Sequence, residues 1–167
     1  AVSAVTTAGD VAIGVALDAP PAGWRLVNPQ DAKDVMAGLL SGGGARVDGD
    51  AAWLAELPQG DEVRITVGEA VVDDLGAAHL QFAPLRYTLG VGCARNCLPS
   101  ELAALVRDVL AEAGVAAQAV HSVNTISLKA DEPAINQIAD VLGVPLRLFS
   151  ADTLEAETPR LATPSDV

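Results

Sequence analysis

The feature that most constrains the fold is an alternation of strand-like and helix-like segments in the second half of the chain. Tyr87–Val91 and Val144–Phe149 are short apolar runs, and Val120–Leu128 alternates weakly between apolar and polar residues, so all three are expected to be strands. Between them, Ser100–Ala113 and the segment that starts near Pro133 repeat apolar residues at helical spacing. Strand–helix–strand–helix–strand order is typical of right-handed crossovers. It predicts a three-layer α/β domain with a largely parallel sheet and helices on both faces.

The first half is less regular and predicts a smaller, less regular N-terminal lobe. Asn28 and Pro29 form a helix start signal, and apolar residues recur at helical spacing as far as Leu40. Glu62–Val67 and His79–Ala83 are expected to be strands. The other expectations are a buried strand or extended entry segment at Val11–Leu17, a break around Asp73–Gly76, and core packing of Trp24 and Trp53. The expected domains are therefore residues 1–86 and 87–167.

The charge of the chain limits its partners. With 22 acidic and 10 basic residues the net charge is -12, which argues against binding to nucleic acid or to anionic membranes. No apolar run approaches the roughly 20 residues that span a bilayer. The start, Ala1-Val-Ser-Ala4, has no initiator Met and no basic flank, so we expect an excised fragment or a processed product in the cytoplasm. A small anionic ligand stays compatible with this charge, because fields from scattered carboxylates fade over about 8 Å.

One glycine-rich loop, Leu89-Gly-Val-Gly-Cys-Ala-Arg-Asn-Cys-Leu-Pro-Ser100, joins a predicted strand to a predicted helix. In open α/β sheets, ligands bind beyond the carboxyl ends of strands. Gly90 and Gly92 let a ligand approach the backbone, and Arg95 offers a planar clamp for an anion. The alternative is a tight turn with a solvent-exposed Arg. On the ligand-loop interpretation, Gly90, Gly92, Cys93, Arg95 and Asn96 are candidate binding residues.

A second candidate loop, Ser127–Pro133, also leads from a predicted strand into a predicted helix. Lys129 is one of two lysines in the chain, and parallel strands would place it on the same sheet edge as Arg95. Ser127 and Lys129 are therefore candidate binding residues. Asp131 can cap the following helix and Glu132 stands in its first turn, so helix capping is favoured over catalysis as the role of these acids.

Metal binding is not expected. Structural zinc takes four ligands, usually in two close pairs, and Cys93 and Cys97 have no second pair while His79 and His121 are isolated. A disulfide between the cysteines would require the loop to fold back, and a cytosolic protein normally keeps thiols reduced. No base stands beside Cys93 in the sequence, so packing is favoured over a role as nucleophile.

Three segments carry a resemblance to a known family: Leu89-Gly-Val-Gly-Cys-Ala-Arg95 with its helix, Ile126-Ser-Leu-Lys-Ala-Asp-Glu-Pro133, and Leu142-Gly-Val-Pro-Leu-Arg-Leu-Phe149. They resemble the C-terminal domain of the CbiG/CobE family of cobalamin (vitamin B12) biosynthesis. Thr6–Asp10 and the stretch from Leu17 to Leu40 resemble the middle region of the longer CbiG proteins. The resemblance is specific in the second half and loose between Asp48 and Leu85.

The resemblance implies a function. CbiG-type proteins are cobalt-precorrin-5A hydrolases, which open a lactone on a macrocycle and release acetaldehyde, whereas CobE-type proteins consist of the C-terminal domain. We therefore expect a precorrin or corrinoid rimmed with carboxylates as ligand, no cofactor, and cobalt only as part of the substrate. Arg95 and Lys129 would clamp carboxylates, backbone N–H groups from Gly92 to Arg95 would stabilise an oxyanion, and Asp131 or Glu132 would activate water.

Two departures from the family leave other interpretations open. The N-terminal domain of the family is absent, and the chain stops where family members continue with a strand and a short helix. The alternatives to hydrolysis are a non-catalytic corrinoid-binding or channelling module, which is CobE-like, a piece of a fusion with a precorrin methyltransferase, and an anion-binding protein unrelated to corrins. Other cobalamin-pathway enzymes and a second copy of the chain are possible partners.

Overall fold

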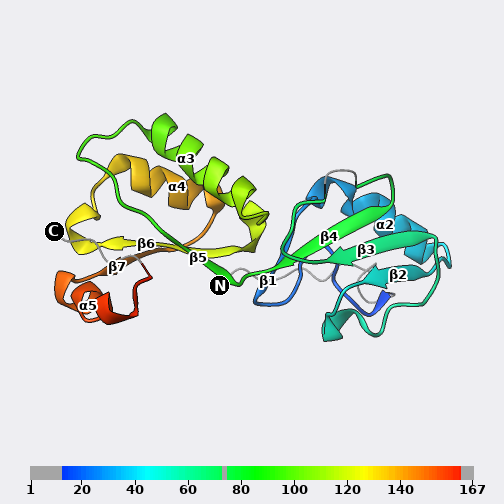
Figure 1. Cartoon of the computed structure of the whole chain (residues 1–167). Helices are drawn as coiled ribbons and strands as arrows, with labels where there is room; N and C mark the ends of the chain where they lie inside the picture. The colour runs from blue at the N-terminus through cyan, green and yellow to red at the C-terminus, as the bar shows by residue number, and fades with distance from the viewer. Residues whose placement is uncertain (1–12, 73–74, 163–167) are drawn as a thin grey trace, which may run out of the picture. The chain divides into compact units, whose positions relative to one another are not determined.

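The computed structural model describes residues 13–72 and 75–162, and Figure 1 shows their secondary structure. The chain divides into two compact units. The first consists of residues 1–85 and 114–119, and the second of residues 86–113 and 120–167. Each unit has its own sheet and its own hydrophobic core, so each is described by itself.

The first unit is built on a four-stranded sheet in the order β1-β4-β3-β2. The strands β2 (Ala45–Asp48), β3 (Val63–Val67) and β4 (His79–Pro84) run parallel. The short strand β1 (Trp24–Leu26) pairs antiparallel with β4. Helix α2 (Ala32–Leu40) packs against β3 and β4 through its apolar face, which explains the helical spacing in the sequence.

The core of the first unit contains most of the aromatic side chains of the chain. Phe82 is fully buried, and the rings of Trp53 and Phe82 meet edge to face with their centroids 5.0 Å apart. The Trp24 ring lies 6.0 Å from that of Trp53. The predicted packing of both tryptophans against this core is confirmed. Such pairs contribute about 0.5–1.5 kcal/mol each beyond the burial of their area.

This unit is more regular than the sequence pattern predicts. The strands β1 and β2 are not predicted, because each is short and interrupted by polar or charged residues. The helix expected after Asn28 starts with a 3-10 turn over Pro29–Asp31. The strand alternative for Val11–Leu17 is wrong for residues 13–17, which form no strand although Ile13, Val15 and Leu17 are buried. Positions 11 and 12, and Asp73 and Asp74 of the predicted break, lie outside the described residues.

The second unit holds a three-stranded parallel sheet in the order β5-β6-β7. Its strands are β5 (Tyr87–Gly90), β6 (Val120–Ile126) and β7 (Leu146–Phe149). Helices α3 (Pro99–Glu112) and α4 (Pro133–Leu142) cover one face, and the short helix α5 (Ala151–Glu155) lies on the other (Figure 1). The predicted α/β class, with parallel strands and helices, is confirmed.

Local signals explain where the two long helices of this unit begin and end. Both have proline in their first turn, where the missing N–H group costs no hydrogen bond. Gly114 and Gly143 follow the helix ends with φ of 64° and 62°, a left-handed conformation that glycine adopts without strain. These stops return the chain to the sheet.

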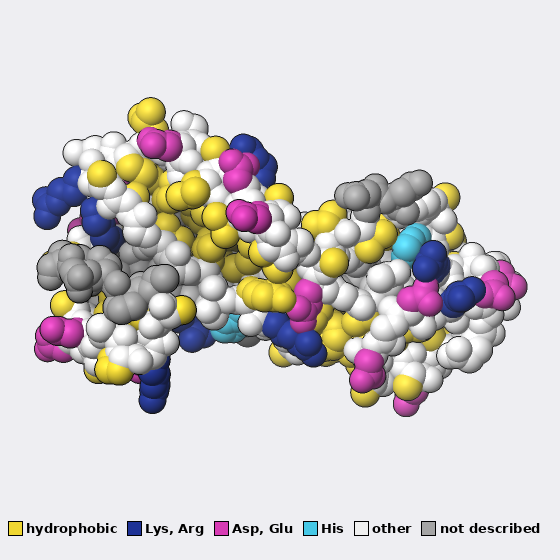
Figure 2. Space-filling model, in the orientation of Figure 1, with side chains coloured by type: hydrophobic (Ala, Val, Ile, Leu, Met, Phe, Trp, Pro, Cys, Tyr) yellow, Lys and Arg dark blue, Asp and Glu magenta, His cyan; other side chains and the backbone are white. Residues whose placement is uncertain are grey.

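The core of the second unit lies between the sheet and the helices α3 and α4. Leu102, Val106 and Val123 are buried there. Two residues of the predicted apolar face of α3, Leu105 and Val109, are instead 57% and 46% exposed, because the face is wider than the surface that the sheet and α4 cover. Figure 2 shows hydrophobic and acidic side chains side by side over this helix. Within residues 13–72 and 75–162, no helix is long and apolar enough to cross a membrane.

Candidate functional site

The candidate site lies on the sheet of the second unit where β5 ends. Parallel pairing aligns Gly90 of β5 with Asn124 of β6. Beyond the strand, the Val91 N–H group donates to the Asn124 carbonyl at 2.9 Å, and the Thr125 hydroxyl donates to the Val91 carbonyl at 2.7 Å. These bonds hold the start of the glycine-rich loop against β6. Val91, the first residue after β5, is therefore hydrogen-bonded to β6 through both its N–H group and its carbonyl group.

The loop then folds back on itself before α3. The Cys97 N–H group donates to the Ala94 carbonyl at 3.3 Å, and Asn96 has a φ of 57°. Asparagine is among the few residues that adopt this left-handed conformation readily. The Asn96 N–H group also donates to Oε2 of Glu132 at 3.4 Å, which ties the loop to the start of α4. The loop is thus held at both its base and its tip.

The face of the sheet opposite α3 and α4 is polar along one row. Asn124 pairs with Gly90 on one side and with Arg147 of β7 on the other. Because side chains alternate along a strand, this row faces away from Val123 and Leu146, which pack in the core. The open face therefore carries an amide and a guanidinium beside a glycine that has no side chain.

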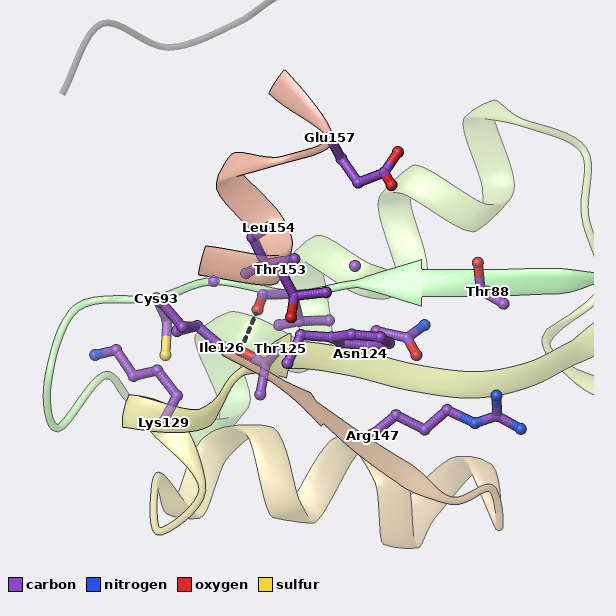
Figure 3. A pocket seen from close by; sticks show the side chains of 14 residues that line it. Thr88, Cys93, Asn124, Thr125, Ile126, Lys129, Arg147, Thr153, Leu154 and Glu157 are labelled. Carbon is purple, nitrogen blue, oxygen red and sulfur yellow. Dashed lines mark hydrogen bonds between the residues drawn. The ribbon is translucent and has the colours of Figure 1, made fainter. Parts of the chain in front are cut away.

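This open face and α5 border a cavity of about 1140 Å³, which we call the main cavity. Apolar side chains of Ile126, Phe149 and Leu154 line it together with polar ones. Figure 3 shows Lys129 at one end and Arg147 at the other, each pointing away from the middle. The complete set of lining residues is Thr88, Gly90, Val91, Gly92, Cys93, Asn124, Thr125, Ile126, Lys129, Arg147, Phe149, Thr153, Leu154 and Glu157.

Two glycines keep the main cavity open. A Cβ atom added at Gly90 or Gly92 would meet no described atom within 4 Å, so both positions face empty space. Neither has a positive φ that would require glycine. Both glycines therefore leave room beside the backbone, and the close approach of a ligand to this loop stays a prediction.

The predicted binding residues fall into two groups. Gly90, Gly92, Cys93 and Lys129 line the main cavity. Arg95 and Asn96 line a neighbouring depression of about 670 Å³, which we call the side depression and which shares Gly92 and Cys93 with the main cavity. Arg95 and Lys129 are expected from the sequence to face one ligand. Instead Lys129 borders the main cavity and Arg95 borders the side depression. Ser127 starts a 3-10 turn, Ser127–Lys129, and is not among the described residues that line either hollow.

The two candidate acids differ sharply in environment. Asp131 is exposed, and the expectation that it caps α4 is wrong, because Glu132 is the N-cap residue and no side chain caps this helix. Glu132 is 8% exposed and lies 4.0 Å from the Lys129 ammonium through Oε2. Its Oε1 atom is buried and has no hydrogen-bond partner among the described residues. Neither acid is among the described residues lining the main cavity.

The two cysteines are free and half-buried. Burial raises the pKa of the Cys97 thiol, and a hydrogen bond with Cys93 and the nearby charges raise it further. Both thiols pack against the core cluster of this unit, and packing is the role predicted for Cys93. Within the described ranges, no group of three His, Cys, Asp or Glu side chains could hold a metal ion.

Several residues of the main cavity are absent from the prediction. Arg147 lies inside a run predicted to be a buried strand, yet it stands between Leu146 and Leu148, and this single polar position is the signal that could have placed it on the open face. Asn124 carries only a weak signal, because the polar residue Thr125 follows it in β6. The residues of α5 and the turn after it, Thr153, Leu154 and Glu157, carry no comparable signal, because only the fold brings them over the sheet.

Comparisons with known proteins agree on one family. Residues 87–167 match the family described as "Cobalamin synthesis G C-terminus". Protein CobE from Sinorhizobium sp is 43% identical over 79 residues, which are 47% of this chain and 51% of that protein. Cobalt-precorrin-5A hydrolase from Salmonella typhimurium is 28% identical over 101 residues, or 60% of this chain and 29% of that one. The chain thus spans about half the length of the first relative and less of the second.

Two solved structures are also similar. The crystal structure of CobE, from the cobalamin (vitamin B12) biosynthetic pathway, is 32% identical, with a TM-score of 0.45 over 47% of this chain and 58% of that one. A cobalamin biosynthesis protein G homolog from Sulfolobus solfataricus is 18% identical, with a TM-score of 0.37 over 85% of this chain and 43% of that one.

Proposed function

Because residues 87–167 belong to the cobalamin synthesis G C-terminal family, we propose that they bind a polycarboxylate precorrin or corrinoid in the main cavity. The observation that carries the proposal is the combination of size and lining. The cavity of about 1140 Å³ exceeds the usual range for small-molecule pockets, which is about 300–1,000 Å³. A contracted tetrapyrrole is a large, flat and apolar ring with carboxylates around its edge, and it needs a hollow of this kind.

The lining matches the two parts of such a ligand. Ile126, Phe149 and Leu154 offer apolar surface to the ring, and burying that surface contributes roughly 25 cal/mol per Å². Arg147 and Lys129 stand at opposite ends and would meet carboxylates on opposite sides of the rim. Gly90 and Gly92 leave the space in which the ring would lie against the backbone.

Asn124 would orient one rim group. Its amide is the register partner of Arg147, so a carboxylate held by the guanidinium would also accept a hydrogen bond from the Asn124 amide. The Asn124 amide contacts only Ser122 of its own strand among the described residues, with distances of 3.3 and 3.5 Å. These are long bonds that a ligand would replace without large cost.

The geometry favours binding over hydrolysis by these residues. Water activation needs a base within hydrogen-bond reach of the reacting atoms. Of the described residues that line the main cavity, only Glu157 carries a carboxylate, and Arg160 pairs with it at 2.9 Å. Lactone opening with acetaldehyde release, the activity of the hydrolase relatives, remains a finer proposal in which Glu132 is the buried acid nearest to the glycine-rich loop.

One set of samples separates these functions. Purified chain is titrated with hydrogenobyrinic acid by absorbance, beside a nucleoside triphosphate as an unrelated anion, and is then incubated with a cobalt-precorrin while acetaldehyde is measured. Saturable binding of the corrinoid but not of the nucleotide supports the proposed site. Acetaldehyde in addition would make the chain a hydrolase. Binding of both anions alike, or of neither by a folded sample, would refute corrinoid recognition.

A further inference from the structure

The glycine-rich loop carries two thiols, Cys93 and Cys97, and neither of them has a predicted chemical role beyond ligand contact by Cys93. Cys93 lines both the main cavity and the side depression, whereas Cys97 lines only the side depression. Both are half-buried, reduced and packed against the same core cluster. Cys93 therefore forms part of the wall between a ligand cavity and a second cysteine.

The backbone brings the two side chains together. The bond from the Cys97 N–H group to the Ala94 carbonyl, at 3.3 Å, closes a turn inside the five-residue segment. Asn96, at a φ of 57°, reverses the chain, and Glu132 holds its N–H group. Both side chains line the side depression, where the Cys97 thiol donates a long hydrogen bond of 3.8 Å to the Leu98 carbonyl. The condition for a disulfide, that the loop fold back, is met.

We propose that Cys93 and Cys97 are a reversible thiol–disulfide pair that is oxidised by a small-molecule disulfide such as glutathione disulfide. The Cys93 thiolate attacks one sulfur of the oxidant and releases one thiolate. The Cys97 thiolate then attacks Cys93 Sγ in the mixed disulfide and releases the second. The two cysteines lose two electrons and two protons in total, and the oxidant becomes two thiols. Cys93 acts first because it also borders the main cavity, through which the oxidant can enter, whereas burial raises the pKa of the Cys97 thiol.

Oxidation would alter the main cavity, an inference that rests on the proposed function. A disulfide holds its two sulfurs about 2.05 Å apart. Joining Cys93 to Cys97 therefore turns the Cys93 side chain toward the side depression and away from the wall that it shares with the main cavity. The ligand loses one packing contact, and the loop loses the freedom to adjust around it. Reduced protein is the binding form.

The test measures disulfide formation first and the effect of the disulfide on ligand binding second. The 167-residue chain is equilibrated with mixtures of reduced and oxidised glutathione, quenched by acid, and analysed by mass spectrometry after alkylation and proteolysis. A Cys93–Cys97 disulfide that grows with the oxidised fraction and disappears with dithiothreitol is the expected result. Glutathione left on Cys93 without closure, or alkylation of both thiols at every ratio, would overturn the pair.

The second step compares the affinity of reduced and oxidised chain for hydrogenobyrinic acid. We expect binding to be weakened about fivefold by oxidation, the effect of losing roughly 1 kcal/mol of packing. Cys93→Ser/Cys97→Ser has no thiol left to oxidise and should bind equally in both buffers. Equal affinity of oxidised and reduced wild type would overturn the control of binding. Failure of reduced, folded protein to bind at all would instead contradict the proposed function, because the disulfide is read independently by mass.

Discussion

Asn124 on β6 and Arg147 on β7 are direct register partners, so an amide and a guanidinium stand side by side on the open face of the parallel sheet. Gly90 continues the same row on β5. The open face of the sheet therefore carries one polar pair, Asn124 and Arg147, with empty space next to it at Gly90. The predictions below follow from this arrangement and from the loop that borders it.

Replacing Arg147 with alanine should weaken corrinoid binding about tenfold. A hydrogen bond to a charged group contributes about 1.5–3 kcal/mol, and the exposure of Arg147 places it at the lower end. Isothermal titration calorimetry gives the affinity. Arg107→Ala, an exposed arginine on α3 that pairs with Asp108, is the matched control and should bind normally. Equal losses in both variants would show that net charge, and not the site, determines binding.

Arg95→Ala distinguishes the two hollows. Arg95 lines the side depression, so its loss should weaken binding less than the loss of Arg147 does. The same calorimetric titration decides the order of the two variants. If Arg95→Ala has the larger effect, the ligand occupies the side depression and the assignment of the main cavity is wrong.

Gly90→Leu should fill the main cavity without unfolding the chain. A Cβ atom at this position meets no described atom within 4 Å, so the new side chain extends into the space proposed for the ring. We expect the melting temperature to stay near the wild-type value while binding is lost. Gly68→Leu, which also places its Cβ in open space but in the first unit, should change neither. Wild-type affinity in Gly90→Leu would contradict the location of the ligand.

Glu132→Ala should loosen the glycine-rich loop. The variant removes the acceptor of the Asn96 N–H group and leaves a buried hollow where the carboxylate was. We expect the free energy of unfolding in urea to fall by about 0.5–1.5 kcal/mol, the net contribution of one hydrogen bond. Asp131→Ala, its exposed neighbour, is the control and should have little effect. Equal stability of both variants would mean that Glu132 does not hold the loop.

His79 should make the first unit less stable below pH 6.5. Burial, with a further contribution from Arg64, lowers the pKa of His79 below its usual 6.5, and its Nε2 atom lies 2.7 Å from the Thr66 hydroxyl. Because the unfolded chain takes up a proton first, stability present above pH 6.5 is lost as the pH falls through the folded pKa. Urea unfolding at pH 5.5 and 7.5 should show a smaller difference for His79→Gln than for wild type. The same difference in both would contradict this role.

Local signals made the second unit predictable. The prolines at Pro99 and Pro133 and the glycines at Gly114 and Gly143 fix the helix ends within the sequence itself. The order of the elements then determines the parallel sheet, and the edge at which Gly90 and Lys129 meet follows from that sheet. The features that depend on a few neighbouring residues, such as the helix ends, could therefore be predicted from the sequence.

The remainder depends on contacts between distant segments. Whether the Arg147 side chain lies in the core or on the open face depends on which face of the sheet α3 and α4 cover. Helix α5 borders the cavity only because of the path that the chain takes after β7. The N-cap residue of α4 is Glu132 and not Asp131. The sequence does not decide between these neighbouring acids, because either can adopt the extended backbone conformation that precedes the helix. In the first unit, β1 becomes a strand only because β4 offers it an edge.

The most direct test of the account is to map the bound ligand on the protein by NMR. Amide resonances of ¹⁵N-labelled chain are followed during titration with hydrogenobyrinic acid. Binding in the main cavity should produce the largest shifts at Gly90–Cys93, Asn124 and Phe149, with smaller changes along α3. Shifts concentrated between Arg95 and Asp108, or none at a saturating ligand concentration, would contradict binding in the main cavity.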